Sequence, residues 1–478
     1  MAFLIGGANS LTAGYDIENS AMFNGDSSVM SRTPSSEGNR RIWTFSGWFK
    51  RCKMAHRGML FTVIPSSASD TNKLMILFHQ NDNLEVGLNS KNILNTNMLF
   101  RDPTAWYHIV AAADTTDGTA ANRFKLYING VQNTSWSTTN LPSEDDDLGI
   151  NQSGELHTIG EQADGSNPFD GYMSEVHFID GTQHAASSFG EFDEDSGIWK
   201  PKKYTGSYGT NGFFLEFQQT GSSANASGFG ADTSGNDHHH GINGFGTHHV
   251  TTDTPTNNFA TLNPLDAGSE GTLSQGNTKY TGGTTSGSGE LQMAGGTFGV
   301  SNGKWYFEVK RGANDSGIGI YAAEHPGVNI GHENPFVSGW NGYSHFVYTS
   351  DGNARSGNAN TSYGGAVHED DIIGVALDLD NGAIYYSDNG TFMDSGDPTS
   401  GASKTGAASN FPTGPDTWIL GFIGDGASGS ASTAEFNFGN PAFSISSGNA
   451  DANGYGNFEY APPSGYYAPC TKNLAKYG

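Results

Sequence analysis

The segment Gly299–Gly303 places Ser301 in the G-x-S-x-G pattern of a nucleophile elbow, where a serine sits on a sharp turn between a strand and a helix. The residues that follow, Trp305–Val309, alternate between apolar and polar side chains as a strand does. Asp and Glu pairs could serve glycoside hydrolysis, but that reaction depends on a separation in space that spacing does not give in a β protein. We therefore predict no catalytic residue and no enzyme, with a glycan hydrolase as an alternative.

A run of four carboxylates, Glu144–Asp147, is the first candidate ion site. Ca²⁺ prefers hard oxygen ligands, which clustered carboxylates on a loop supply. The candidate calcium ligands are Asp145, Asp146 and Asp147, joined by Asp170. A solvated acidic turn is the simpler interpretation of the run. We expect the fold to require no cofactor, and Ca²⁺ is the ion that these carboxylates could hold.

Histidines at 238–240 and 248–249 form a second candidate, because neutral imidazole binds Zn²⁺ and Ni²⁺. Neither cysteine nor an ordered ligand spacing accompanies them. Their surroundings are rich in Gly, Ser, Thr and Asn, a composition typical of a flexible polar loop. We predict a loop at these positions and no metal site.

Trp340, Asn341 and Tyr343 are the candidate ligand contacts, because they lie in a stretch rich in Gly, Asn and Ser. Aromatic rings stack on sugar faces, and amides form hydrogen bonds with hydroxyl groups. Core packing would also explain the aromatic residues. The large aromatics of the first half are expected in the core, namely Trp43, Trp48 and Trp106.

The composition restricts the partners of the chain. The sequence has 478 residues, 67 of them Gly, and a formal net charge of −26. Such a charge repels phosphate backbones and anionic membranes, so nucleic acid and membrane insertion are not expected. The opening residues lack the basic flank and the long apolar run of a signal peptide. Only Cys52 and Cys470 occur, so we expect two isolated thiols and no disulfide framework.

Short alternating runs bounded by Gly, Asn, Asp and Pro recur along the chain, which predicts an all-β fold. In Phe124–Gly130 an alternating strand ends at an Asn-Gly turn, and Trp305–Lys310 directs Tyr306, Glu308 and Lys310 outward. Continuously apolar runs indicate strands covered on both faces, at Ile372–Leu377 and Trp418–Ile423. We predict two tandem antiparallel β-sandwich domains of jelly-roll type.

The predicted organisation has four parts. Residues 1–18 form an anchor segment whose apolar plug is Phe3–Ile5, placed beside the first domain. A sandwich of residues 19–220 follows, and the Gly/Ser/His-rich stretch 221–262 reads as a linker. The second sandwich with a C-terminal extension covers 263–478.

The first half resembles the laminin-G-like, concanavalin-A-like lectin sandwiches over about residues 19–200. The matching segments are Ala21–Gly25, Trp43–Lys50, Trp106–Val110, Phe124–Gly130, His157–Gly160 and Phe169–Phe178. The second half resembles SPRY domains over about residues 290–445, through Gly303–Val309, Gly317–Ile320, Asp371–Asp378, Ala383–Gly390 and Phe436–Gly439. The first resemblance implies a pair of antiparallel sheets that binds glycans in many members, some with calcium. The second implies a non-catalytic sandwich that presents loops to protein or peptide ligands.

The pairing of these modules, with Asp253–Pro264 between them, resembles structural and fibre proteins of tailed phages. This resemblance implies a virion protein made in the host cytoplasm and released by lysis. Its expected partners are other virion proteins and a host-surface glycan or protein, in a homo-oligomer that we expect to be a trimer. A capsid decoration or connector protein without receptor binding is a further alternative. Host contact is expected on the second module, through loops Glu333–Gly365 and Asp394–Asn410.

Overall fold

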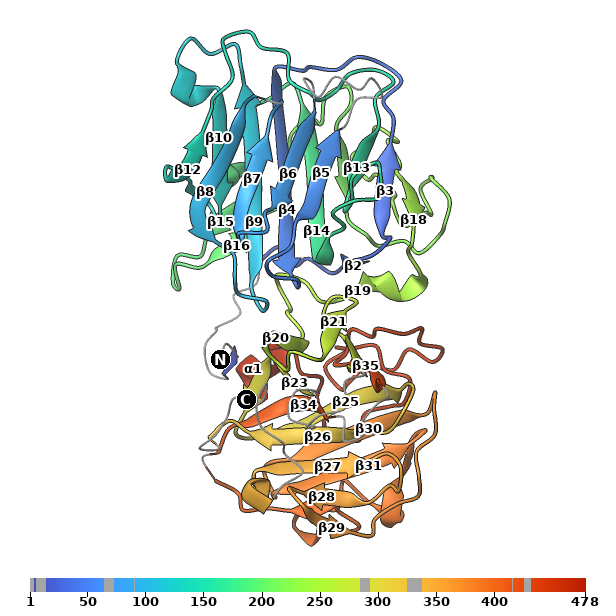
Figure 1. The fold of residues 1–478 in the computed structure, drawn as a ribbon. Coiled ribbons are helices and arrows are strands. Elements are labelled where there is room, and N and C mark those ends of the chain that lie inside the picture. The colour runs from blue at the N-terminus through green and yellow to red at the C-terminus, as the bar shows by residue number, and fades with distance from the viewer. Residues whose placement is uncertain are drawn as a thin grey trace. The chain divides into compact units, whose positions relative to one another are not determined.

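The computed structural model describes residues 4–5, 14–63, 73–89, 91–283, 293–324, 338–414, 416–424 and 431–478. The chain divides into two compact units. Residues 13–256 form one, here called the N-terminal unit, and residues 1–12 with 257–478 form the other, the C-terminal unit. Both are built almost entirely from strands, so the predicted all-β class with two sandwiches is confirmed (Figure 1).

Two antiparallel sheets enclose the core of the N-terminal unit, each with eight strands in the described ranges. The first runs in the order β11 (Val131–Gln132), β10 (Phe124–Ile128), β9 (Trp106–Asp114), β4 (Ile42–Arg51), β14 (Asp170–Asp180), β2 (Ser20–Asn24) and β19 (Val250–Thr251), with β17 (Phe213–Leu215) also on β14. The second runs in the order β12 (Trp136–Thr139), β8 (Ile93–Leu99), β7 (Asn83–Gly87), β6 (Leu74–Phe78), β5 (Gly58–Val63), β13 (His157–Ile159), β3 (Val29–Arg32) and β18 (Gly241–Asn243). Stacked rings such as Phe45 and Phe61, 5.0 Å apart, fill the space between them.

The outer face of the first sheet is covered by a short hairpin, β15 (Gly190–Phe192) with β16 (Trp199–Pro201). A small apolar cluster lies beneath this cover and includes Val110, Ile179 and Phe189. Trp43 and Trp48 are buried as expected, whereas Trp106 is half-buried.

Residues 221–262 are not a linker. β18 extends the second sheet by pairing with β3, and β19 extends the first sheet by pairing with β2. The division between the units falls after Thr256. The prediction was wrong because small polar residues can bury their backbone in sheet edges even where bulky apolar side chains are few. We call residues 221–256 the edge strap.

The C-terminal unit also contains two sheets. Its first sheet has nine described strands in the order β1 (Leu4–Ile5), β24 (Phe298–Val300), β34 (Trp418–Gly424), β26 (Gly317–Ala322), β27 (Ser344–Tyr348), β28 (Ala354–Ser356) and β29 (Ala359–Thr361), with β20 (Leu262–Ala267) on β23 (Met293–Gly296) and β23 on β34. Its second has eight described strands in the order β21 (Thr272–Ser274), β22 (Lys279–Thr281), β35 (Thr433–Asn437), β25 (Lys304–Arg311), β30 (Ile372–Asp378), β31 (Ala383–Asp388) and β32 (Thr391–Phe392), with β33 (Ser409–Asn410) on β31.

Helical structure is short throughout the described chain. One α-helix, α1 (Thr471–Tyr477), occurs there, and the 3₁₀ turns are η2 (Ala120–Asn122), η3 (Ala186–Ser188), η4 (Thr247–His249), η7 (Ser338–Trp340), η8 (Met393–Ser395) and η9 (Gly401–Ser403). Among the residues that could be searched, no helix has the length and apolar character needed to cross a membrane.

The C-terminal extension covers the outer face of β25. Tyr306 and Glu308, predicted to point to solvent, are both buried, and Tyr306 packs against Phe458 with ring centroids 5.2 Å apart. The two carboxylate oxygens of Glu308 accept hydrogen bonds from the backbone N–H groups of Glu459 and Tyr460, at 2.9 and 2.7 Å. The alternation was predicted correctly, but this sheet face is an interior face.

The apolar N-terminal segment belongs to the C-terminal unit, whereas the prediction assigned it to the side of the first domain. Leu4 and Ile5 form β1, which pairs in parallel with Phe298 and Gly299 of β24. Phe3 and residues 6–13 lie outside the described residues. This placement is possible because β24 offers an open sheet edge, to which an extended segment adds by main-chain hydrogen bonds.

Candidate functional site

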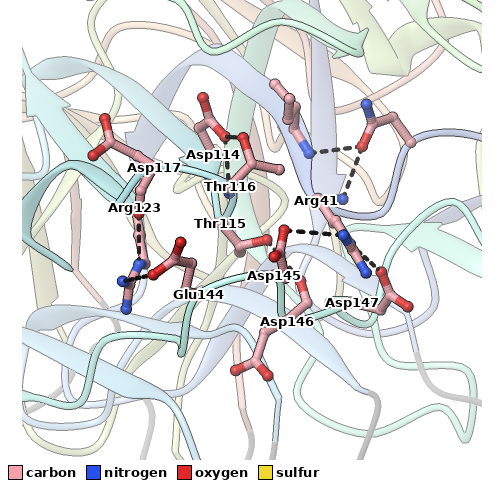
Figure 2. Close-up of polar contacts among 12 residues, drawn as sticks. Arg41, Asp114, Thr115, Thr116, Asp117, Arg123, Glu144, Asp145, Asp146 and Asp147 are labelled. Carbon is pink, nitrogen blue, oxygen red and sulfur yellow. Dashed lines mark hydrogen bonds and ion pairs between the residues drawn. The ribbon is translucent and has the colours of Figure 1, made fainter. Parts of the chain in front are cut away.

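The acidic loop Glu144–Asp147 lies against Arg41, at the start of β4 (Figure 2). The guanidinium group of Arg41 donates to Asp147 at 2.7 Å and to Asp145 at 3.0 Å. The hydrogen bond to Asp147 raises the pKa of Arg41 above its usual range. A protein cation therefore already balances two of the four carboxylates that were predicted to bind Ca²⁺.

Backbone contacts fix the same loop to the turn that follows β9 (Figure 2). The Asp145 N–H donates to the Thr115 carbonyl at 2.8 Å, and the Thr115 hydroxyl donates to the Asp146 carbonyl at 2.8 Å. The Asp146 carboxylate accepts the backbone N–H of Ser143, also at 2.8 Å. These contacts give the carboxylates structural partners within a closed turn.

Asp170, the fourth predicted calcium ligand, lies at the other end of the sheet. Strand β4 pairs Ile42 with Asp114 at one end, next to the acidic loop. Its other end pairs Arg51 with Gly171, the residue after Asp170. A ten-residue strand spans about 30 Å. The structure thus separates the predicted ligands, and no three metal-binding side chains come together anywhere in the searched residues.

Trp340, predicted to contact a ligand, is a core residue. Only 1% of its surface is exposed, and it packs with Met293, Tyr321 and Phe422, among others. The prediction for this residue was wrong because a Gly-rich sequence environment carries no information about which face of the chain is covered. Asn341 and Tyr343, by contrast, are exposed, Tyr343 to 39%.

The turn that carries Asn341 and Tyr343 is held against the β28–β29 hairpin. The Gly342 N–H donates to the Ser356 hydroxyl at 2.7 Å, and the Asn358 N–H donates to the Asn341 side-chain oxygen at 3.1 Å. A third bond runs from the Gly357 N–H to the Ser344 hydroxyl at 3.1 Å. Two turns are thereby joined into one rigid surface.

The histidines of the edge strap are parts of the folded unit rather than of a flexible loop. His240 is buried, and its ring meets that of Phe213 edge-on with centroids 4.6 Å apart. Burial lowers the pKa of His240 to about 3, and burial beside His248 lowers that of His249 to about 4. Neutral imidazoles at these positions serve as packing groups.

A buried Ser46–His108 pair, not found from the sequence, has the composition of a nucleophile and base. The Trp199 indole N–H, which can only donate, forms a hydrogen bond of 3.1 Å to His108 Nδ1. His108 Nε2 therefore carries the imidazole proton and donates it to the Ser46 hydroxyl, 3.0 Å away. In this tautomer the imidazole does not take a proton from Ser46, and the pair is a structural hydrogen bond.

Ser301 occupies an exposed turn between β24 and β25. The predicted strand after it is confirmed, so the segment is strand–turn–strand and departs from the strand–turn–helix geometry of a nucleophile elbow. The two cysteines are free and buried, one in each unit, as expected.

Comparison with known families assigns a domain to each unit. The model described as the concanavalin A-like lectin/glucanases superfamily matches residues 23–186, and the SPRY domain model matches residues 304–413. The chain therefore contains a lectin-like domain followed by a SPRY domain, as the resemblances implied. A search of curated proteins gave no match.

Solved structures match parts of the chain at low sequence identity. A Bacteroides ovatus protein, to which carbohydrate binding is provisionally ascribed, is 14% identical with a TM-score of 0.32 and aligns over 50% of this chain. The chain spans 60% of that protein's length. The SPRY domain of human HERC1 is 13% identical, with a TM-score of 0.28. The alignment covers 37% of this chain and 96% of that domain. A heptameric SAP-like pentraxin from Limulus polyphemus is 15% identical, with a TM-score of 0.26. The alignment covers 35% of this chain and 78% of the pentraxin chain.

Proposed function

We propose that this protein is a non-catalytic, surface-binding component of a tailed-phage particle, an adhesin that attaches to a host-surface glycan or protein. The domain matches support a pair of lectin-like and SPRY sandwiches suited to binding. The phage origin rests on the pairing of the two modules and on the composition. In this proposal the protein is a virion homo-oligomer, made in the host cytoplasm, that contacts other virion proteins.

The observation that carries the proposal is the placement of exposed uncharged side chains on a rigid sandwich, at the turn of Asn341 and Tyr343. Binding proteins commonly present such residues on loops above a fixed scaffold. Two serines have sequence or structural neighbours that suggest hydrolysis, but the geometry of each favours a non-catalytic role. The Ser46 hydroxyl accepts a hydrogen bond from a buried imidazole, and Ser301 precedes a strand.

Two measurements test the proposal. Antibodies against the full-length protein should label intact phage particles in immunogold electron microscopy. Labelled full-length protein should bind cells of a phage-susceptible strain within a panel of aquatic bacteria, and it should block infection of that strain. Particle labelling without any cell binding would instead favour a decoration or connector protein, and sugars released from cell envelopes would favour a glycan hydrolase.

A further inference from the structure

The exposed turn of the C-terminal unit has the chemistry of a sugar-binding surface. We propose that Tyr343 and Asn341, together with Asn358 and Asn360 of the adjoining β28–β29 hairpin, bind a neutral glycan. This inference rests on the proposed adhesin function and deepens it, because it names the class of ligand and the place where it binds. We call these four residues the Tyr343 surface.

The backbone of Tyr343 is held by hydrogen bonds on both sides of the residue. The Tyr343 N–H donates to the Trp340 carbonyl at 2.9 Å, and the Trp340 side chain lies in the core. The Tyr343 carbonyl accepts the N–H of Ala322, in β26, at 2.7 Å. An exposed ring on a fixed backbone loses little conformational freedom on binding, which favours affinity.

Two further exposed amides, Asn358 and Asn360, belong to the adjoining β28–β29 hairpin. Asn358 follows Gly357 in the β28–β29 turn, and Asn360 lies in β29 itself. Their side chains form no hydrogen bond with any residue that the structure describes. A primary amide offers two donors and an acceptor, which suits the alternating donor and acceptor capacity of sugar hydroxyls.

The sequence of the β28–β29 turn is also uncharged, in contrast to a chain of net charge −26. From Ser356 to Tyr363 the sequence has no ionisable acid or base other than the Tyr363 phenol. The nearest cation in sequence, Arg355, is engaged by Asp351 at 2.8 Å and stacks on Tyr348 with 4.2 Å to the ring centroid. This turn offers no cation of its own from Ser356 to Tyr363, and the net negative chain repels anions, which favours neutral sugars over sialylated or phosphorylated ones.

The test is an array of neutral and acidic bacterial and plant oligosaccharides probed with the full-length protein. We expect binding to neutral glycans that changes little between 50 and about 500 mM salt, because no counterions are released. Tyr343→Ala should weaken it about tenfold and Asn358→Ala less, as expected for an aromatic contact at the centre of an interface. Tyr343→Phe should keep most of the affinity, since the ring remains.

Phe192→Ala provides the matched control, because Phe192 is a 50% exposed aromatic residue of the other unit. It should leave glycan binding unchanged. Glycan binding that survives Tyr343→Ala, or that is lost equally in Phe192→Ala, would overturn the assigned surface. Cell binding that persists after glycans are oxidised with periodate but is abolished by protease treatment of the cells would overturn the glycan ligand. Both of those outcomes would leave the adhesin function standing, whereas absence of any cell binding would remove that function as well.

Discussion

The Lys50 ammonium and the Asp253 carboxylate form an ion pair of 2.8 Å inside the N-terminal unit, where their side chains are 1% and 0% exposed. The other Asp253 oxygen accepts the Trp106 indole N–H at 3.2 Å, and the Ser20 hydroxyl donates to the Asp253 carbonyl at 2.6 Å. The end of the edge strap is thus joined to β4, β9 and β2 by polar contacts.

Removal of one partner of this pair should be strongly destabilising. Asp253→Ala leaves the ammonium of Lys50 buried without its counter-ion, at an expected cost of about 3–5 kcal/mol. The double variant Lys50→Met with Asp253→Leu should cost less, because it removes both charges. Urea unfolding gives the free energies, and hydrogen exchange at β4 amides assigns the loss to the N-terminal unit. A double variant as unstable as the single one would contradict the ion-pair interpretation.

Glu308 should make the stability of the C-terminal unit depend on pH. Burial raises the pKa of Glu308 to about 7, partly opposed by the hydrogen bonds that it accepts. Because this pKa is higher in the folded than in the unfolded chain, the stabilisation is complete below about pH 4.3 and is lost as pH rises through 7. In Glu308→Gln this loss disappears. The deficit in melting temperature of the variant should shrink between pH 5 and pH 8, and a constant deficit would contradict the expectation.

Acid should loosen the edge strap. The pKa of His240 is lowered to about 3 by burial, so the folded unit binds its proton less readily than the unfolded chain does. Stability from this residue is present above about pH 6.5 and is lost as pH falls toward 3. Hydrogen exchange at β18 amides should therefore accelerate between pH 6.5 and 4.5, after correction for intrinsic rates. His240→Phe keeps the aromatic contact with Phe213 and should reduce this increase in exchange rate. An equal increase in the parent protein and the variant would show that His240 is not the cause.

Two aromatic substitutions three residues apart should have different effects on stability. Trp340→Ala removes a fully buried indole and should cost about 3–5 kcal/mol in unfolding free energy. Tyr343→Ala, at an exposed position, should stay within about 0.5 kcal/mol of the parent protein. Chemical denaturation of both variants checks this. A large loss in Tyr343→Ala would show that its ring supports the fold.

Calcium should have little influence on the protein. Arg41 already bonds to Asp145 and Asp147, so we expect EDTA with reductant to shift the melting temperature only slightly. Arg41→Ala removes the competing cation. In this control variant, an effect of Ca²⁺ on the melting temperature is easiest to detect. Calorimetry that detects tight Ca²⁺ binding to the parent protein, lost in Asp145→Asn, would restore the calcium site.

Local patterns in the sequence predicted much of the fold. The Asn129-Gly130 turn after β10 is present with both residues at positive φ, 46° and 80°, because that hairpin needs residues that adopt this conformation. Alternation predicted the faces of β25, since side chains repeat every second residue. It did not predict that Glu308 is buried, because the covering Glu459 lies 151 positions later.

The candidate site was harder to predict for the same reason. The partners of Asp145 and Asp147 come from Arg41, 104 and 106 positions earlier, and no local signal marks such a pairing. Trp340 and Tyr343 have similar neighbours in sequence, but only long-range packing decides that one is interior and the other exposed. Composition alone also misassigned the edge strap, whose backbone pairs with β2 and β3.

The covered face of β25 has a consequence for the order in which the chain matures on the ribosome. Once residue 256 has emerged, every segment of the N-terminal unit has been synthesised, and that unit can close. The C-terminal unit must wait, because Ala260 donates its N–H to the carbonyl of Pro469 at 2.9 Å and Tyr306 is covered by residues around Phe458. Until translation reaches this extension, an apolar sheet face stays open to chaperones and to neighbouring nascent chains.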